Sequence, residues 1–130
     1  MSLNVRVITP DRVVWDANAD EIILPSSSGQ LGILVDHAPL LTALEIGVMR
    51  IKAEDKWISI VLMEGFAEVE NNKVTILCNG AEEDRTIDRA LAQTELEKVT
   101  LLVDQATTKK EKIEATIQLR KSKARLQAVA

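Results

Sequence analysis

The chain has 130 residues, 46% of them hydrophobic, and a formal net charge of −4 at pH 7. This length corresponds to one ordinary domain, or to a small domain with an appended segment. The negative charge argues against a general nucleic-acid binder, because such proteins carry an excess of Lys and Arg that neutralises phosphates. No apolar run approaches the roughly 18 residues of a membrane-spanning helix. The N-terminal sequence lacks the features of a secretory signal or a transit peptide, so we expect the protein to stay in the compartment where it is made.

The first eighty residues contain short apolar runs, rich in Val and Ile, at regular intervals. We expect strands over residues 3–9, 13–15, 21–24, 31–35, 47–52, 57–63, 65–70 and 74–78. Residues 16–20 and 53–56 are predicted to connect strands, and Asn71-Asn72 accepts the left-handed backbone of a hairpin turn. Many short strands at this spacing indicate an antiparallel β-sandwich or a flattened barrel. Aliphatic side chains must fill its core, because the chain has only three aromatic residues.

Two polar turns flank the predicted strand at residues 31–35. Residues 26–29, three serines and a glycine, favour the first turn, because Gly tolerates positive φ and Ser hydroxyls bond to nearby backbone. Residues 36–39 favour the second, and the apolar pair Leu40 and Leu41 follows it directly. Leucines beside a turn either fold under the sheet or offer a surface to a partner, and both interpretations stay open.

The sequence does not assemble the residues of a catalytic site. His37 is the only histidine, and nothing in the sequence places the nearby serines or Asp36 in the geometry that nucleophilic catalysis requires. We interpret His37 as a hydrogen-bonded turn or interface residue. No Gly-rich loop precedes a Lys-Ser or Lys-Thr pair, so the usual phosphate-binding loop is absent. We therefore predict no catalytic residues.

The sequence also predicts neither a metal site nor a cofactor. Cys78 is the only cysteine, which excludes an internal disulfide and a zinc site built from Cys and His37 alone. We expect Cys78 to be a small buried hydrophobic residue. Asp16, Asp20 and Glu21 could bind a cation weakly, but a solvated loop is the better interpretation.

The pattern changes at Gly80. Residues 82–85 are predicted to form an exposed charged linker, and two helices should follow. Apolar spacing predicts the buried face of the first helix: Ala92, Leu96, Val99, Val103 and Ala106. Asp88 or Thr86 is its expected N-cap. The spacing in the second helix predicts two rows: Ala115, Leu119, Ser122, Leu126 and Val129, and the weaker row Ile113, Ile117 and Ala124. Thr108 and Glu111 match a capping box at its start. We expect a β-sandwich domain over residues 1–84 and a helical hairpin domain over residues 85–130.

Two features of this C-terminal segment suggest a conformational switch and an acidic partner. The connector at residues 107–110 contains no Gly or Pro, so a compact hairpin and a long extended helix are both accessible, and a permanent hairpin remains the alternative. Residues 105–130 also hold seven Lys or Arg against two Asp or Glu, although the rest of the chain is acidic. The natural partner of such a segment is an acidic surface.

The order and spacing of these residues resemble the epsilon subunit of F-type ATP synthases, and the resemblance covers essentially the whole chain. It is carried by four stretches: residues 3–10, 12–16, 28–34 and 36–42. They point to the plastid and cyanobacterial branch of that family. The resemblance implies a β-sandwich followed by a two-helix hairpin. It also implies a non-catalytic rotor subunit that links the gamma subunit to the ring of c subunits.

The resemblance further implies three contact surfaces. The turn at Ser28, Gly29, Gln30 and Leu31 would face the c ring, with Gln30 where the family commonly has an acidic residue. The segment His37, Ala38, Pro39, Leu40, Leu41 and Thr42 would face gamma. In an extended form of the hairpin, the basic side chains Arg120, Lys121, Lys123 and Arg125 would contact the catalytic beta subunits of the alpha/beta assembly and oppose ATP hydrolysis.

Nucleotide binding is not carried over from the family. Some bacterial epsilon subunits have an Ile/Leu-Asp-x-x-Arg-Ala motif that is associated with ATP binding, but Leu91 stands at the Arg position here and Arg89 comes two residues early. On a helix that shift turns the guanidinium by roughly 200° around the axis. Ile87, Asp88 and Arg89 therefore remain candidates for a weak nucleotide site only, and Arg89, Arg120 and Arg125 could still gather around a phosphate in a folded hairpin.

The competing functions are, in order, an ATP-sensing module that uses the helices, a free-standing adaptor and a small hydrolase. The resemblance places the protein on the thylakoid membrane as a peripheral part of the ATP synthase complex, in a chloroplast or a cyanobacterium.

Overall fold

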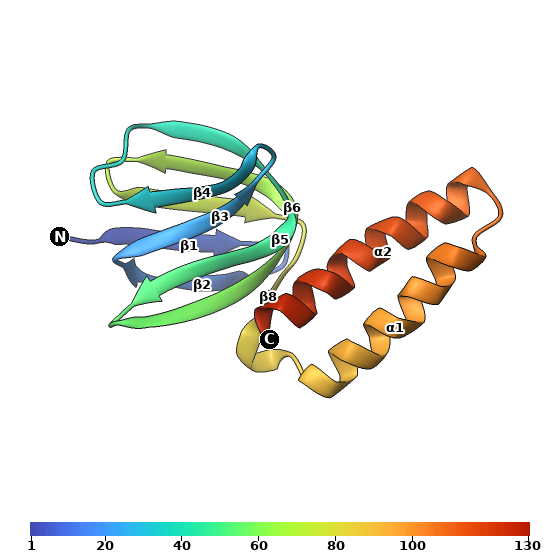
Figure 1. The fold of residues 1–130 in the computed structure, drawn as a ribbon. Helices are drawn as coiled ribbons and strands as arrows, with labels where there is room; N and C mark the ends of the chain where they lie inside the picture. Colours follow the sequence, from blue (N-terminus) through green and yellow to red (C-terminus); the bar gives the residue numbers. More distant parts are fainter.

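The computed structural model of the chain describes all of its residues, Met1–Ala130, as a β-sandwich with a helical arm (Figure 1). The strands are β1 (Leu3–Ile8), β2 (Val13–Ala19), β3 (Glu21–Ser26), β4 (Gly29–Leu34), β5 (Leu40–Ala53), β6 (Lys56–Glu70), β7 (Lys73–Cys78) and β8 (Ala81–Glu83). A short 3-10 helix η1 (Asp84–Thr86) leads to the helices α1 (Arg89–Gln105) and α2 (Lys109–Ala128). The predicted fold class, a β-sandwich followed by a two-helix hairpin, is confirmed.

The strands are joined in the order β2-β1-β7-β6-β5-β3-β4, and β8 pairs with β6. All pairs are antiparallel except β1 and β7, which are parallel. The long hairpin of β5 and β6 curves through both layers, as Figure 1 shows. One part of β6 pairs with β8 and the other with β7. Between them the ladder of β5 and β6 skips the pair of Glu45 and Glu64, and Glu64 has a positive φ of 73°. One hairpin thus connects the two layers.

Alternation along the strands places aliphatic side chains in a single core of 18 buried residues. In β1 the residues Leu3, Val5 and Val7 are fully buried, whereas the side chains between them face solvent. None of the 18 is aromatic, because Trp15 only packs against the edge of the core and Trp57 and Phe66 are exposed. The prediction of an aliphatic core is confirmed.

Three predictions about strand boundaries were wrong. The strand expected at 47–52 begins at Leu40, as β5. Residues 16–19 continue strand β2 instead of forming a loop, and Asp16 lies 3.6 Å from Arg6 on β1 across the ladder. An edge strand accepts such polar residues because its outer face is solvated. The runs at 57–63 and 65–70 are also one strand, since Gly65 permits the bend between them without ending the ladder.

The helices form an antiparallel hairpin that touches the sandwich through the C-terminal part of α2 (Figure 1). The two predicted hairpin rows face each other, with Ala92, Val99 and Ser122 buried. Asp88 caps α1 by accepting a hydrogen bond from the Leu91 amide at 3.1 Å, as predicted. Thr108 caps α2 in the same way, and Glu111 accepts a bond from the amide of residue 107. Neither helix is long and apolar enough to cross a membrane.

Candidate partner-binding surfaces

The first polar turn is the tight connection between β3 and β4. Ser27 and Ser28 form the turn itself, and the Ser26 hydroxyl donates a hydrogen bond of 2.6 Å to the carbonyl of Gly29. Gly29 has a φ of +118°, a conformation that other residues rarely adopt. The residues predicted to contact a c ring therefore span the turn and the first part of β4. Gln30 is exposed, whereas Leu31 packs against the core.

The second polar turn lies at the opposite end of β4. The Asp36 amide donates a hydrogen bond to Asn72 Oδ1 at 2.6 Å, and Asn72 Nδ2 donates one to Asp36 Oδ1 at 3.2 Å. These bonds link this turn to the turn between β6 and β7. His37 Nδ1 lies 2.7 Å from the carbonyl oxygen of Ala38. The length of β4, about 20 Å for six residues, separates His37 from Ser28. This separation argues against a serine–histidine catalytic pair.

Leu40 and Leu41 have different environments, so the core interpretation holds for Leu40 and the partner interpretation stays a prediction for Leu41. Leu40 packs against the core, whereas Leu41 is 70% exposed. They are the first residues of β5 and not part of the turn, so the strand's alternation sends their side chains to opposite faces. Only Leu41 is therefore available to a partner.

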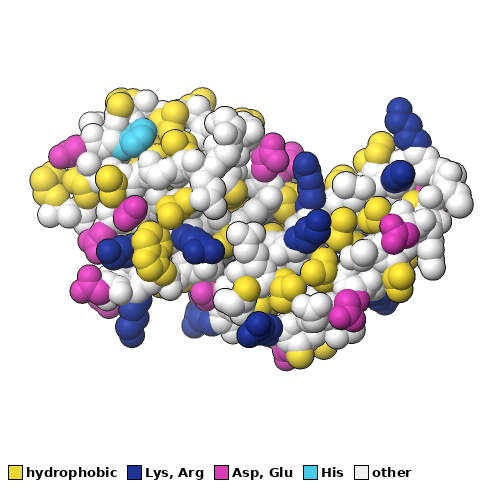
Figure 2. Space-filling view, viewed as in Figure 1, with side chains coloured by type: hydrophobic (Ala, Val, Ile, Leu, Met, Phe, Trp, Pro, Cys, Tyr) yellow, Lys and Arg dark blue, Asp and Glu magenta, His cyan; other side chains and the backbone are white.

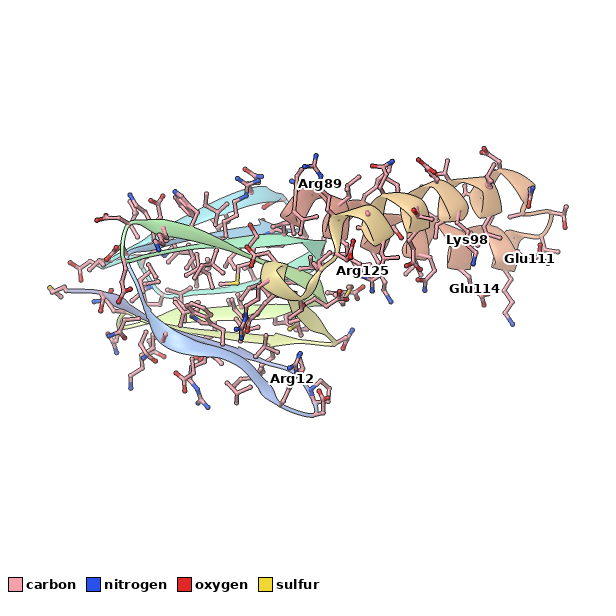
Figure 3. The ribbon with its side chains drawn as sticks, turned by 90° about the horizontal axis from the view of Figure 1, so that it is seen from below. Arg12, Arg89, Lys98, Glu111, Glu114 and Arg125 are labelled. Carbon is pink, nitrogen blue, oxygen red and sulfur yellow. The ribbon has the colours of Figure 1, made fainter.

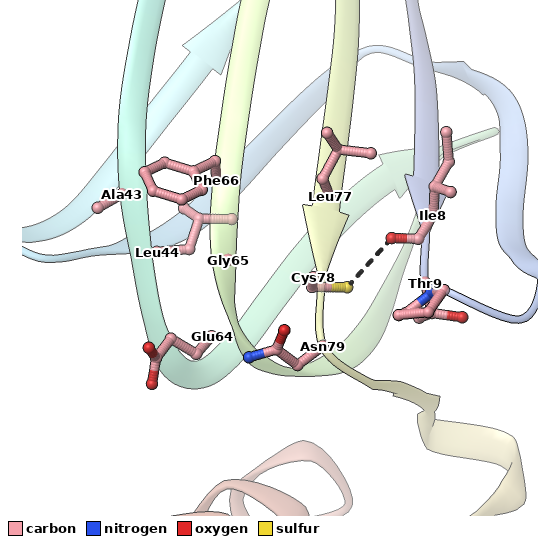
Figure 4. A pocket seen from close by; sticks show the side chains of 11 residues that line it. Ile8, Thr9, Ala43, Leu44, Glu64, Gly65, Phe66, Leu77, Cys78 and Asn79 are labelled. Atoms are coloured by element: carbon pink, nitrogen blue, oxygen red, sulfur yellow. Dashed lines mark hydrogen bonds between the residues drawn. The ribbon is translucent and has the colours of Figure 1, made fainter.

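Leu41 borders an exposed apolar surface that was not predicted. The register aligns one outward residue from each of four neighbouring strands: Ala43, Phe66, Leu77 and Ile8. Phe66 is 58% and Leu77 54% exposed. They line a groove of about 540 Å³ at this end of the sandwich (Figure 4). We call Leu41, Ala43, Phe66, Leu77 and Ile8 the apolar row.

The apolar row could have been predicted from the alternation of inward and outward residues along its strands. In β6 the inward residues are Ala67 and Val69, so Phe66 shares its outward face with two glutamates. In β7 the inward residues alternate in the same way, and Leu77 is the one large apolar residue on the outward face. A bulky apolar side chain on an otherwise polar face indicates a contact surface, because neither folding nor solubility requires it there.

Cys78 is one of the residues that line the same groove, and it is buried, as predicted. Its Sγ donates a hydrogen bond of 3.7 Å to the carbonyl of Ile8, drawn in Figure 4. Burial raises the pKa of the thiol, because the charged thiolate would lose its hydration. The side chain is a buried, uncharged part of the sandwich at neutral pH.

The helical arm is held to the sandwich by a small apolar cluster and one ion pair. Ala124 packs on Val48 and Val61, with four partly buried hydrophobic residues around them. Beside this cluster Arg125 donates three hydrogen bonds to Glu82: Nε to Oε1 and Oε2 at 3.1 Å each, and Nη2 to Oε2 at 2.9 Å. The two side chains are 28% and 34% exposed, so this bidentate pair is partly shielded from water.

Residues 82–85 were predicted to be an exposed linker, and that prediction was wrong. Glu82 and Glu83 belong to β8, and Glu82 binds Arg125. Asp84 accepts a hydrogen bond from the Ser59 amide at 3.0 Å. The acidic residues that indicated a solvated linker instead anchor the segment to the sheet and to α2.

Among the four cations predicted to contact the beta subunits, only Arg125 has a carboxylate partner in this structure. Arg120 and Lys123 are exposed and Lys121 is half-buried, and no carboxylate lies within ion-pair distance of any of the three. In the folded hairpin Arg125 is therefore engaged internally, whereas the other three remain free.

The residues of the candidate nucleotide site have structural roles. Ile87 packs beside the apolar cluster, and the Asp88 carboxylate caps α1. Arg89 and Arg125 both lie at the end of the hairpin nearest the sandwich (Figure 3), but Glu82 holds the guanidinium of Arg125. No group of three or more His, Cys, Asp or Glu side chains is placed to hold a metal ion. Asp16 instead pairs with Arg6.

Comparisons with known proteins agree with this architecture. The family model described as ATP synthase, Delta/Epsilon chain, beta-sandwich domain matches residues 2–84. The chain is 80% identical over 130 residues to the ATP synthase epsilon chain, chloroplastic, of Emiliania huxleyi, and the match covers 100% of both chains. It is 62% identical to the corresponding chain of Guillardia theta, covering 100% of this chain and 99% of that one.

A cyanobacterial relative and a solved structure extend the comparison. The ATP synthase epsilon chain of Synechococcus sp. (strain JA-2-3B'a(2-13)) is 52% identical, covering 98% of this chain and 93% of that one. A chain in the structure of the Euglena gracilis mitochondrial ATP synthase, OSCP/F1/c-ring, has the same fold, with a TM-score of 0.85 at 22% identity over 98% of this chain and 80% of that chain. The protein belongs to the family of ATP synthase epsilon chains, which are accessory and not catalytic subunits.

Proposed function

We propose that this chain is the rotor subunit that joins the gamma subunit to the c ring of a proton-translocating ATP synthase. The single observation that carries the proposal is the apolar row on the sandwich. Leu41, Phe66 and Leu77 share one outward face, and each is more than half exposed. None of them belongs to the core of the folded monomer. Such a patch is typical of a protein–protein contact.

Gamma is the partner that we assign to the apolar row. Leu41 lies in the segment His37–Thr42, which the family resemblance assigns to gamma, and the row continues from that segment across β6 and β7. The groove beside it gives an apolar anchor of the partner a place to enter. The exposed polar turn at Ser28, Gly29 and Gln30 is assigned to the polar loops of the c ring, with the hydrogen bonds of Gln30 in place of a charge.

The contact with gamma can be tested by removing two side chains of the apolar row. We expect the double variant Phe66→Ser, Leu77→Ser to bind recombinant gamma at least about tenfold more weakly than the natural chain, since two desolvated anchors are lost. The matched control is Leu91→Ser, Leu101→Ser on α1, whose side chains are 67% and 58% exposed. Equal affinity of both variants for gamma, measured by calorimetry, would contradict the assignment.

The helical arm is proposed to oppose ATP hydrolysis when it leaves the sandwich. Its free cations Arg120, Lys121 and Lys123 are suited to an acidic surface of the beta subunits, and attraction between such surfaces weakens as salt screens it. Arg125 would join them only after its bonds to Glu82 break. The folded hairpin is then the form that allows ATP hydrolysis.

Charge neutralisation in the assembled enzyme tests this role. Replacing Arg120, Lys121 and Lys123 with Ala should raise the ATP hydrolysis rate of a reconstituted ATP synthase toward that of the complex without this chain. Replacing Lys109, Lys110 and Lys112 removes the same charge from the other half of α2 and should leave more of the inhibition in place. Hydrolysis that is unchanged by the first set would remove the charge argument.

The chloroplastic and cyanobacterial relatives support a finer location for the complex. We place it on the thylakoid membrane, with this chain bound there only through its partner subunits. Washed thylakoid membranes should retain the chain when the c ring and gamma are present and lose it when either is missing.

A further inference from the structure

Strand β4 forms an edge of the sheet that no other strand continues. It is the last strand in the sheet order and pairs with β3 alone, beside which it lies in Figure 1. Proteins usually protect such edges with charged residues or Pro, because the outward backbone groups can pair with another chain. The strand at the other end of the sheet, β2, carries Asp16 in an ion pair with Arg6. Residues 29–34 of β4 contain no charged residue and no Pro, so β4 is an unprotected edge.

The register shows which backbone groups of β4 point outward. Pro25 on β3 pairs with Gln30, and because Pro has no N–H, the two cannot exchange hydrogen bonds with each other. Hydrogen-bonded and non-hydrogen-bonded pairs alternate along an antiparallel ladder, so Gly32 and Leu34 are in pairs of the same type as Gln30. The N–H and C=O groups of Gln30, Gly32 and Leu34 therefore point away from β3. We call these three residues the free edge of β4.

The free edge is open to a second strand. Outside the ladder with β3, the only backbone hydrogen bond to it runs from the His37 amide to the Leu34 carbonyl, at 3.2 Å. Gln30 is exposed, Leu34 is 57% exposed, and a Cβ at Gly32 would have no atom within 4 Å. Figure 2 shows an uncharged surface directly beside the single histidine, His37, which lies in the turn that follows β4.

The free edge is complementary to itself. A two-fold axis at Gly32 places Gly32 opposite Gly32 of a second copy, and Gln30 opposite Leu34 of that copy. The two glycines can then exchange a pair of hydrogen bonds, and each Leu34 amide can donate to the Gln30 carbonyl of the other copy. The Leu34 side chain lies beside that of Gln30 across the strands and loses part of its exposure to water.

We propose that the chain, when free of its partners, pairs with a second copy of itself through β4, as antiparallel strands of one continuous sheet. Charge favours this occupant. Asp36 is the only charged residue between Ser28 and His37, and the same register places it opposite Ser28 of the second copy, so no like charges meet. The paired strands are about 20 Å long, which is a small contact, and we therefore expect a weak and reversible pair.

The pairing gives the free chain a way to cover its exposed edge. It needs neither the helical arm nor another subunit, so it stands independently of the function proposed above. Under the assignment of Gln30 to the c ring, which rests on that proposed function, the pair has to separate before the chain enters the rotor.

Hydrogen exchange at single amides of the full chain tests the register. We expect the Gly32 and Leu34 amides to exchange more slowly as the concentration rises from about 10 μM to about 1 mM, while sedimentation shows a dimer forming. The Leu31 and Ile33 amides should be slow at every concentration, because they point toward β3. A chain that stays monomeric, with exchange at Gly32 and Leu34 independent of concentration, would overturn the proposal.

Opposite charges at Gly32 test the two-fold axis. Gly32→Lys places two ammonium groups opposite each other and should weaken self-association about fivefold or more, and Gly32→Asp should do the same. An equimolar mixture of the two variants should associate again, because each Lys then meets an Asp. The matched control is Leu101→Lys on α1, a side chain that is 58% exposed, which should leave self-association unchanged.

Three further results would contradict the pairing. They are an equal loss of self-association in the control, a mixture that does not associate, and growth beyond a dimer, since a two-fold contact closes on itself. A monomeric chain whose Gly32 and Leu34 amides become protected only when gamma or the c ring is added would assign the edge to a strand of that partner. Circular dichroism and thermal unfolding of each variant establish that the sandwich is folded.

Discussion

Gly65 shows how much one missing side chain matters in the long hairpin of this sandwich. A Cβ built at this position would overlap the carbonyl oxygen of Leu77 and lie 2.7 Å from Cα of Cys78. Both neighbours are backbone atoms of β7, so they cannot turn aside as a flexible side chain can. The bend of β6 that carries the groove and the apolar row therefore depends on a glycine here.

We expect Gly65→Ala to lower the free energy of unfolding by about 2–3 kcal/mol, because β6 and β7 must separate locally to admit the methyl group. Gly32→Ala is the control, since a Cβ there has no neighbour within 4 Å and its φ is not in the left-handed region. Its effect should stay within about 0.5 kcal/mol. Urea unfolding of both variants measures the difference, and similar losses would show that close approach to β7 is not the cause.

Cys78 gives the chain a small dependence of stability on alkaline pH. Burial raises the pKa of its thiol above the unfolded value of about 8.5. The folded state therefore holds the proton more tightly, and this contribution is present below the unfolded pKa and lost as the pH rises through the folded one. We expect the natural chain to lose more stability than Cys78→Ala between neutral and strongly alkaline pH. The free energy of unfolding of both chains is measured with urea at each pH. The same dependence on pH in the two chains would contradict this prediction.

At the scale of single helices and strands, the sequence predicted the features that depend on residues close together in the chain. The caps at Asp88 and Thr108 were found because capping acts over three residues. The two rows of α2 were found because helical periodicity assigns faces. Apolar alternation likewise located the inward residues of the strands.

The features that sequence did not reveal depend on contacts between distant residues. Glu82 was expected to be solvated, but 43 residues separate it from its partner Arg125. The apolar row joins residues of four strands, and only the register brings them together. The parallel pairing of β1 with β7 is another such feature, since no local signal specifies which distant strands are neighbours. His37 and Leu41 were each named as candidate contact residues from the sequence, but the exposed apolar surface around Leu41 was not predicted.

The ion pair between Glu82 and Arg125 is the element that we expect to keep the arm docked. Glu82→Gln removes the charge and weakens the bidentate contact by about 1 kcal/mol, a modest figure because both side chains are partly exposed. The backbone amides at the C-terminal end of α2 should then exchange with solvent faster.

Glu83→Gln is the control for that change. It removes the same charge from the neighbouring residue, whose partner Arg85 is local and 78% exposed. Hydrogen exchange followed by mass spectrometry should show little change at α2 in this variant. Equal acceleration by both substitutions would mean that net charge, and not the specific pair, holds the arm.

The whole molecule consists of a sandwich with a large core and a helical arm that packs on it through a small apolar cluster. All 18 residues of the main core lie between Leu3 and Ala81, within the sandwich. The arm adds only Ala124 to the second buried cluster, on Val48 and Val61. An arm attached by so little apolar contact can be displaced at a cost far below that of unfolding the sandwich. This difference in scale is what a movable regulatory segment requires.

The proposed boundary after residue 84 leads to the last prediction. A chain that ends at Asp84 keeps the entire main core, and it also keeps the hydrogen bond from the Ser59 amide that anchors its end. We expect it to fold into the same sandwich, with a dispersed NMR spectrum and a cooperative thermal transition. Its stability should be lower by about 2–3 kcal/mol, because Val48 and Val61 lose their cover. Replacing both valines with Thr in the truncated chain should reduce its tendency to aggregate, whereas a truncated chain with no cooperative transition would show that sandwich and arm fold as one unit.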